Sequence, residues 1–247
     1  MIQIQPIDIQ PVATEWHKIM IVIAGRTPLL LHDRLAMSRA EAWRKANPRE
    51  KAPPPEVEAE MGCVRDELGV ILVRSDAVLE SAKEGAKQVL HKLRTRTTNA
   101  TREIASSIMP VRDSFRLFRP VPDFEDDPDS YLAQIRALLD THPDIDSLNR
   151  AIKPLTPITE YAIDTRRVLV QRQGVMRSRP RIEPPWALVG EFEYDLGLGK
   201  DAQGPIAVQL VLKALGFAGQ IVGIGDYRPQ KGGIHGKYEV VRAWLVW

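Results

Sequence analysis

The distribution of apolar residues predicts strands near both ends of the chain. A β-branched run begins near His17 and ends at Gly25, and Thr27-Pro28 and three leucines follow it, which is typical of a buried strand and a turn. Further strand patterns occur at four places, with Gly174 as a bulge or turn in the third segment. These segments are residues 70–73, 108–111, 161–195 and, as two strands flanking a loop, 220–247.

Helical patterns lie between these strands. Ser38 and Ser75-Asp76 are good N-caps for two of them, and Pro205 begins another that should end before Gly216. The predicted helices are residues 38–47, 75–90, 130–139 and 205–215.

The order strand, helix, strand recurs at both ends of the chain. This order favours the α+β class, with one antiparallel sheet and helices on one face, as in a ferredoxin-like (RRM-like) fold. We therefore expect a single domain over residues 1–247, with a core from about 16–90 and 186–247. Large basic insertions are expected in the region between, about 91–185.

The charges change this picture through their distribution. There are 34 Lys and Arg against 32 Asp and Glu, so the net charge alone signals no anionic partner. Many of the acids gather in residues 56–67 and 123–129, which leaves other stretches locally basic.

The lone Cys63 fits a reducing compartment, and we expect a buried thiol. No signal peptide and no apolar run of about 18 residues is recognisable, so a cytoplasmic protein without a membrane partner is expected.

A series of arginines forms the first candidate site. If the last three lie on one strand, their spacing of two places them on one face about 6.6 Å apart, close to the step between phosphates of an extended strand. An ordinary solvated strand face is the alternative. The series is Arg166, Arg167, Arg172, Arg177, Arg179 and Arg181.

A glycine-rich stretch near the C-terminus forms the second candidate site. Glycines allow the backbone to approach a phosphate and present its N–H groups, and the side chains between them add charge and a stacking ring. A long hairpin between two core strands is the alternative. The stretch comprises Gly223, Gly225, Tyr227, Arg228, Lys231, Gly232, Gly233, His235, Gly236 and Lys237.

A basic segment over residues 91–102 forms the third candidate site, with a solvated loop as its alternative. Its candidate contacts are Lys92, Arg94 and Arg96. Three residues just beyond the first strand could face the same groove: Arg26, His32 and Arg34.

The sequence offers little for catalysis. The five histidines lack metal-ligand spacing, and no Walker loop, dinucleotide fingerprint or serine-hydrolase motif is present, so we expect neither cofactor nor metal. His32 and His235 could form a metal-independent acid and base pair for RNA cleavage, which keeps an enzymatic alternative open.

The stretch from Gly223 to Val240 resembles the glycine-rich loop of RAMP proteins, the ferredoxin-like family of CRISPR RNA-binding subunits, and above all their guide-RNA backbone subunit. Residues 27–32 and 175–180 also resemble segments of small phage or prophage proteins. The likeness covers mainly the first 35 and last 85 residues. It implies single-stranded nucleic acid running across the sheet, a basic inserted thumb or finger, and head-to-tail assembly. The loop from Arg228 to Lys237 would contact phosphates.

Together these features predict a non-catalytic, multimeric subunit of a ribonucleoprotein that binds single-stranded nucleic acid, RNA rather than DNA. We expect a homo-oligomer, with other ribonucleoprotein subunits as further partners. The alternatives are a RAMP-type endoribonuclease, a phage single-strand DNA-binding or annealing protein, and a phage structural or interaction protein.

Overall fold

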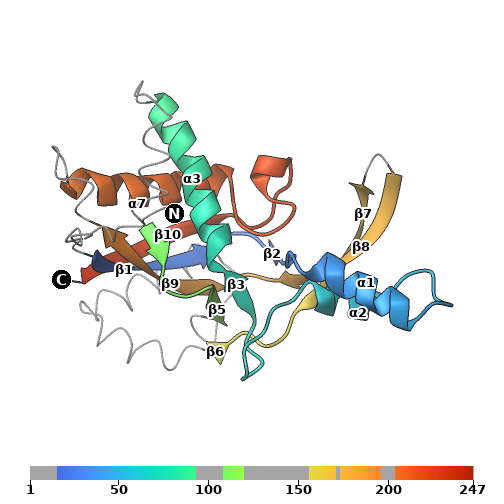
Figure 1. Ribbon diagram of the computed structural model, residues 1–247. Coiled ribbons are helices and arrows are strands. Elements are labelled where there is room, and N and C mark those ends of the chain that lie inside the picture. The colour runs from blue at the N-terminus through green and yellow to red at the C-terminus, as the bar shows by residue number, and fades with distance from the viewer. Residues whose placement is uncertain (1–15, 93–107, 120–155, 171–172, 196–203, 247) are drawn as a thin grey trace, which may run out of the picture.

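The computed structural model describes residues 16–92, 108–119, 156–170, 173–195 and 204–246 (Figure 1). Within them the protein is a mixed α+β structure with antiparallel sheets and few helices, which confirms the predicted class. None of the described helices has the length and apolar character needed to cross a membrane.

The main sheet is built around β1 (Trp16–Gly25), which lies between β10 (Tyr238–Val246) and β9 (Ala187–Asp195). The order β10-β1-β9 continues through β5 (Ser114–Arg119) to β3 (Leu72–Arg74), and every pairing is antiparallel. Two short strands flank this path, β4 (Ile108–Pro110) on β9 and β6 (Thr156–Pro157) on β5.

Two long helices pack together on the main sheet. The helices are α3 (Ser75–Lys92) and α7 (Gly204–Ile221), and Figure 1 shows both on the same side of it. Small residues allow the helices to approach closely, because Ala82 and Ala86 of α3 and Ala214 and Ala218 of α7 are all buried in the core.

A second unit of structure extends from one end of this core. Its sheet has the order β2-β8-β7, where β7 (Ala162–Val170) and β8 (Gln173–Ile182) form a hairpin and β2 (Leu29–Leu30) pairs with β8. The helices α1 (Ala36–Ala46) and α2 (Pro55–Met61) lie beside the hairpin, and Figure 1 shows all four elements projecting away from α3 and α7.

Several predicted boundaries differ from the structure. Helix α1 begins at Ala36, two residues before the expected cap, and α2 was not predicted although Pro55 and Glu56 are typical of a helix start. Helix α7 continues through Gly216, because its apolar face extends to Ala218 and burial outweighs the low helix propensity of one glycine.

Two further predictions differ from the structure. Residues 220–224 end α7 and enter a loop instead of forming a strand, so only the second C-terminal strand exists. Two strands of the expected insertion, β4 and β5, belong to the main sheet. The predicted helix over 130–139 lies outside the described residues.

Candidate functional site

The glycine-rich loop joins α7 to β10 and is hydrogen-bonded to β2 and to the turn that precedes β2. The Asp226 N–H donates to the carbonyl of Leu30 (2.8 Å), and the Gly236 N–H donates to the carbonyl of Pro28 (2.7 Å). The N–H groups of Gly232 and Gly233 donate to carbonyls of the loop itself. The expectation that these three glycine amides face a ligand is therefore wrong, because they hold the loop in shape.

The glycines serve close packing. A Cβ atom at Gly233 would lie 1.8 Å from the carbonyl oxygen of Tyr227, and one at Gly236 would lie 1.8 Å from that of Ile224. Gly236 also has a φ of +68°, which side chains rarely tolerate. The conformation of the loop is thus fixed by backbone packing that only glycine allows at these two positions.

The arginines of β8 share one face, as their spacing predicts, but each has an intramolecular partner. Arg177 pairs with Glu58 of α2 (2.8 Å), and Arg179 pairs with Asp226 of the glycine-rich loop (2.7 Å). The remaining member, Arg181, pairs with the neighbouring Glu183 (2.6 Å). The expected row of unpaired guanidinium groups is not present, because two carboxylates distant in sequence and one at the end of the strand pair with these arginines.

Arg166 links the hairpin to the loop. It forms an ion pair with Asp164, and its guanidinium carbon lies 4.4 Å from the ring centroid of Tyr227. Its Nη2 atom lies 3.1 Å from Nε2 of His235. Since a guanidinium group only donates, His235 Nε2 accepts this hydrogen bond and the imidazole is neutral.

Burial lowers the pKa of His235, and the charges of Arg166 and Arg181 lower it further. His235 is 5% exposed, and its Nδ1 atom has no partner among the described residues. This buried, hydrogen-bonded ring is poorly placed to exchange protons with a substrate. The observed setting therefore gives no support to catalysis by a His32 and His235 pair.

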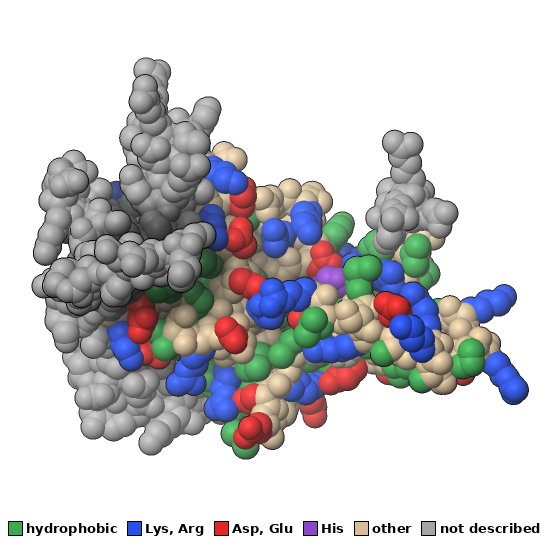
Figure 2. All heavy atoms as spheres, in the orientation of Figure 1, with side chains coloured by type: hydrophobic (Ala, Val, Ile, Leu, Met, Phe, Trp, Pro, Cys, Tyr) green, Lys and Arg blue, Asp and Glu red, His purple; other side chains and the backbone are tan. Residues whose placement is uncertain are grey.

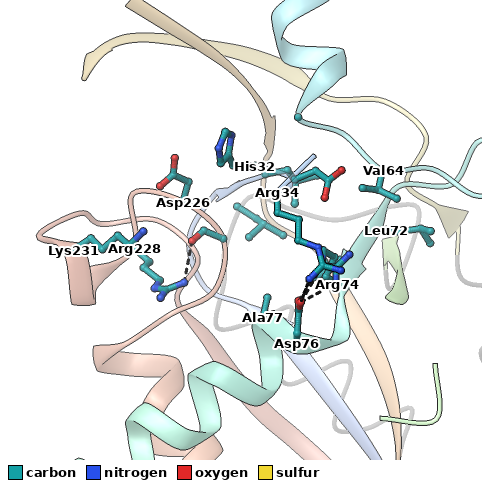
Figure 3. A pocket seen from close by; sticks show the side chains of 16 residues that line it. His32, Arg34, Val64, Leu72, Arg74, Asp76, Ala77, Asp226, Arg228 and Lys231 are labelled. Atoms are coloured by element: carbon teal, nitrogen blue, oxygen red, sulfur yellow. Dashed lines mark hydrogen bonds and ion pairs between the residues drawn. The ribbon is translucent and has the colours of Figure 1, made fainter. Parts of the chain in front are cut away.

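A hollow of about 240 Å³ lies where the loop, the β2 exit and the start of α3 meet. Figure 3 shows Arg228 and Lys231 on one side of it and Arg34 and Arg74 on the other. We call this hollow the cationic groove. Its polar lining is His32, Asp33, Arg34, Arg74, Asp76, Asp226, Arg228 and Lys231.

The acids of the groove are neutralised by arginines. Asp226 pairs with Arg179, Asp33 lies 3.0 Å from Arg39, and Asp76 lies 2.8 Å from Arg74. Asp33 and Arg39 form an ion pair without a well-aligned hydrogen bond. Both carboxylate oxygens of Asp33 lack a hydrogen-bond partner within the described chain.

Three cations of the groove keep a charge that no close carboxylate of the described chain neutralises, although Arg228 donates hydrogen bonds to the neutral side chain of Gln230 (2.9 and 3.2 Å). Within the described residues, neither Arg228 nor Lys231 has a carboxylate in ion-pair range. The guanidinium of Arg34 comes no closer than 3.8 Å to the Asp76 carboxylate, and 69% of the Arg34 side chain is exposed. Such an exposed contact is weak. Figure 2 shows basic side chains across the middle of this face, around a histidine. The groove can therefore hold an anion.

The other predicted contacts are dispersed. Arg26 pairs with Glu239 (2.7 Å), and the amide of Arg26 donates to the carbonyl of Lys237. Arg167 is exposed and crosses Gly174 on the opposite face of the hairpin from Arg166. Lys92 ends α3 without a described side chain, and Arg94, Arg96 and Arg172 lie outside the described residues.

The described residues offer neither a reactive thiol nor a metal-binding cluster. Burial raises the pKa of the Cys63 thiol to about 11, so the thiol is protonated at neutral pH, as its predicted core position implies. The described residues contain no group of three or more His, Cys, Asp or Glu arranged to hold a metal ion.

Sequence reasoning missed Arg74 and Asp76 as members of the groove. The only signal at this position was the Ser75-Asp76 helix start, which was assigned to capping. No protein-family model and no curated protein matches the chain. Function is therefore inferred from the chemistry of the groove.

Proposed function

We propose that the protein is a non-catalytic binder of single-stranded nucleic acid, with RNA favoured over DNA, and that it works as a multimeric subunit of a ribonucleoprotein. The cationic groove carries this proposal. Arg34, Arg228 and Lys231 converge on it from two sides, while its acids are already paired with other arginines.

The groove combines charge with an apolar lining. Leu29, Leu31, Val64 and Leu72 line it together with the cations. Binders of single strands use basic side chains along the backbone and apolar or aromatic surfaces for the bases. Tyr227, 39% exposed on the adjoining loop, supplies such a ring.

The strand order supports a ferredoxin-like core of the kind that the RAMP resemblance implies. The path β10-β1-β9-β5 is antiparallel, with α3 between β1 and β5 and α7 between β9 and β10 along the chain. That order corresponds to the β-α-β-β-α-β arrangement. In this proposal the β7–β8 hairpin and the α1–α2 pair are insertions, and the described hairpin is rich in arginine.

The arginines divide into two roles under this proposal. Arg177 and Arg179 hold the hairpin to α2 and to the glycine-rich loop, whereas Arg228 and Lys231 contact phosphate. Self-association and other ribonucleoprotein subunits as partners belong to the proposal through the RAMP resemblance. The absence of catalysis belongs to it because the sequence has no convincing catalytic placement of its histidines.

Binding of a labelled single-stranded oligonucleotide at rising salt tests the proposal. We expect affinity to fall steeply between about 50 and 200 mM salt, since each neutralised phosphate releases counterions. RNA should bind more tightly than DNA of the same sequence, and a duplex more weakly than either. Affinity that barely responds to salt, or cleavage of the RNA without metal, would contradict the proposal.

A further inference from the structure

A second hollow of about 210 Å³ adjoins the cationic groove. It lies between α1, α2 and the β7–β8 hairpin, and its lining shares His32 and Gly62 with the groove. The two hollows are therefore neighbours that share part of their lining.

The walls of the second hollow are mainly apolar. Ala36 and Ala40 come from α1, Met61 comes from α2 and Val168 comes from β7. Met37 stands at the hollow with 75% of its surface exposed. Methionine adapts to the shape of a partner and packs well on aromatic rings.

The rest of the lining is polar and includes three arginines: His32, Arg44, Glu58, Arg177, Ser178 and Arg179. The Glu58 carboxylate accepts a hydrogen bond from Arg177 (2.8 Å) and another from the backbone N–H of Ser178 (3.0 Å). A carboxylate has about four acceptor positions. Glu58 can therefore accept further N–H donors from a ligand.

We infer that the second hollow receives a nucleobase of the same strand whose phosphate lies in the cationic groove. A ligand that is flat, apolar on its faces, polar at its edge and joined to an anion matches both hollows at once. Nucleotides in a single strand have this chemistry. This inference rests on the proposed function and adds to it a contact with the base.

Filling the hollow tests the inference. Ala40→Leu adds a larger side chain at a buried position of the lining, whereas Ala42→Leu makes the same change at an exposed position of α1. Each variant is compared with the unmodified protein for binding of a single-stranded oligonucleotide and of an abasic oligomer of equal length, which keeps the phosphates and lacks the bases.

We expect Ala40→Leu to weaken binding of the base-containing strand roughly tenfold, the effect of losing about one base contact. Binding of the abasic oligomer should stay unchanged, and Ala42→Leu should behave like the unmodified protein. Met37→Ser, at an exposed position, should weaken binding in the same selective way. It decides the question if Ala40→Leu fails to fold.

Equal effects of these variants on both oligomers, or no effect on either, would overturn the base contact. The proposed function would stand in that case as long as the unmodified protein binds the oligonucleotide in a salt-dependent way. Failure of the unmodified protein to bind any oligomer would overturn both. The two failures are thus distinguishable.

Discussion

The guanidinium carbon of Arg166 lies 4.4 Å from the ring centroid of Tyr227, so a cation–π contact joins the β7–β8 hairpin to the glycine-rich loop. Arg166 also carries the ion pair to Asp164 and the hydrogen bond to His235. One side chain therefore couples three groups from two segments distant in sequence. This coupling sets the position of the hairpin beside the groove.

Replacing Arg166 should loosen that connection. Arg166→Ala removes the contact with Tyr227 and leaves Asp164, whose side chain is 9% exposed, with only the distant charge of Arg181 at 3.9 Å. We expect the free energy of unfolding to fall by about 2 kcal/mol, measured by urea denaturation. The matched control is Arg167→Ala on the exposed face of the same strand, which should cost less than about 0.5 kcal/mol. Equal losses would contradict the linking role of Arg166.

The buried imidazole of His235 should make stability depend on pH. Its pKa is lowered by burial and by Arg166 and Arg181, so the folded state resists protonation more than the unfolded chain does. The contribution of His235 to the free energy of unfolding should therefore be fully present above about pH 6.5. It should decline as the pH falls below that value, by at most about 1.4 kcal/mol per pH unit. Urea denaturation from pH 7.5 to 5.5 measures this slope.

In the same range His235→Gln should show a smaller slope, because no titrating group remains at this position. His32, exposed at the groove, also has a lowered pKa and accounts for part of what persists. An unchanged slope in His235→Gln would show that His235 titrates alike in the folded and unfolded states.

Local patterns in the sequence predicted the fold class and most of the central elements. The apolar run of residues 19–24 is buried, and α3 begins at Ser75 as its capping residues indicate. The course of α7 was predicted less well because a glycine inside a helix resembles a stop signal. Only tertiary burial of Ala218 explains why the helix continues.

The site was harder to predict because ion pairs depend on the fold. The spacing of Arg177 and Arg179 correctly indicated a shared face, yet nothing local shows that Glu58 and Asp226 will neutralise them. Long-range pairing of this kind leaves no periodic signal. By contrast, Arg228 lies in a loop whose composition indicated a binding surface, and it does line the cationic groove.

Arg228 and Lys231 should matter for oligonucleotide binding and contribute little to the free energy of unfolding. Replacing both Arg228 and Lys231 by alanine removes two groove cations that have no carboxylate partner in the described chain. We expect oligonucleotide affinity to fall at least tenfold, by about 1 kcal/mol or more per charged contact, and the salt slope to decrease by about 1.4. The free energy of unfolding should change by less than about 0.5 kcal/mol.

Arg179→Ala should lower stability, because it leaves Asp226 unpaired where the Asp226 side chain is only 20% exposed. We expect a loss of about 1–3 kcal/mol in unfolding free energy. Lys213→Ala, on the exposed side of α7, serves as the control for a lost positive charge. If replacing Arg228 and Lys231 weakens oligonucleotide binding no more than Lys213→Ala does, the groove is not the phosphate contact.

Two helix glycines should respond oppositely to alanine. A Cβ atom at Gly85 of α3 would lie 2.3 Å from the carbonyl oxygen of Ala214 and 2.6 Å from the Cβ of Ala218, both in α7. Overpacking there should destabilise the protein by about 1–3 kcal/mol. At Gly216, an added Cβ meets no described atom within 4 Å, so alanine should stabilise α7 by about 0.5–1 kcal/mol through its higher helix propensity.

Thermal and urea denaturation of both variants measure these changes. Gly85→Ser, a second small residue at the crossing, should destabilise as Gly85→Ala does, since the clash begins at Cβ. Stabilisation by Gly85→Ala would show that α3 and α7 do not approach as closely as the structure has them.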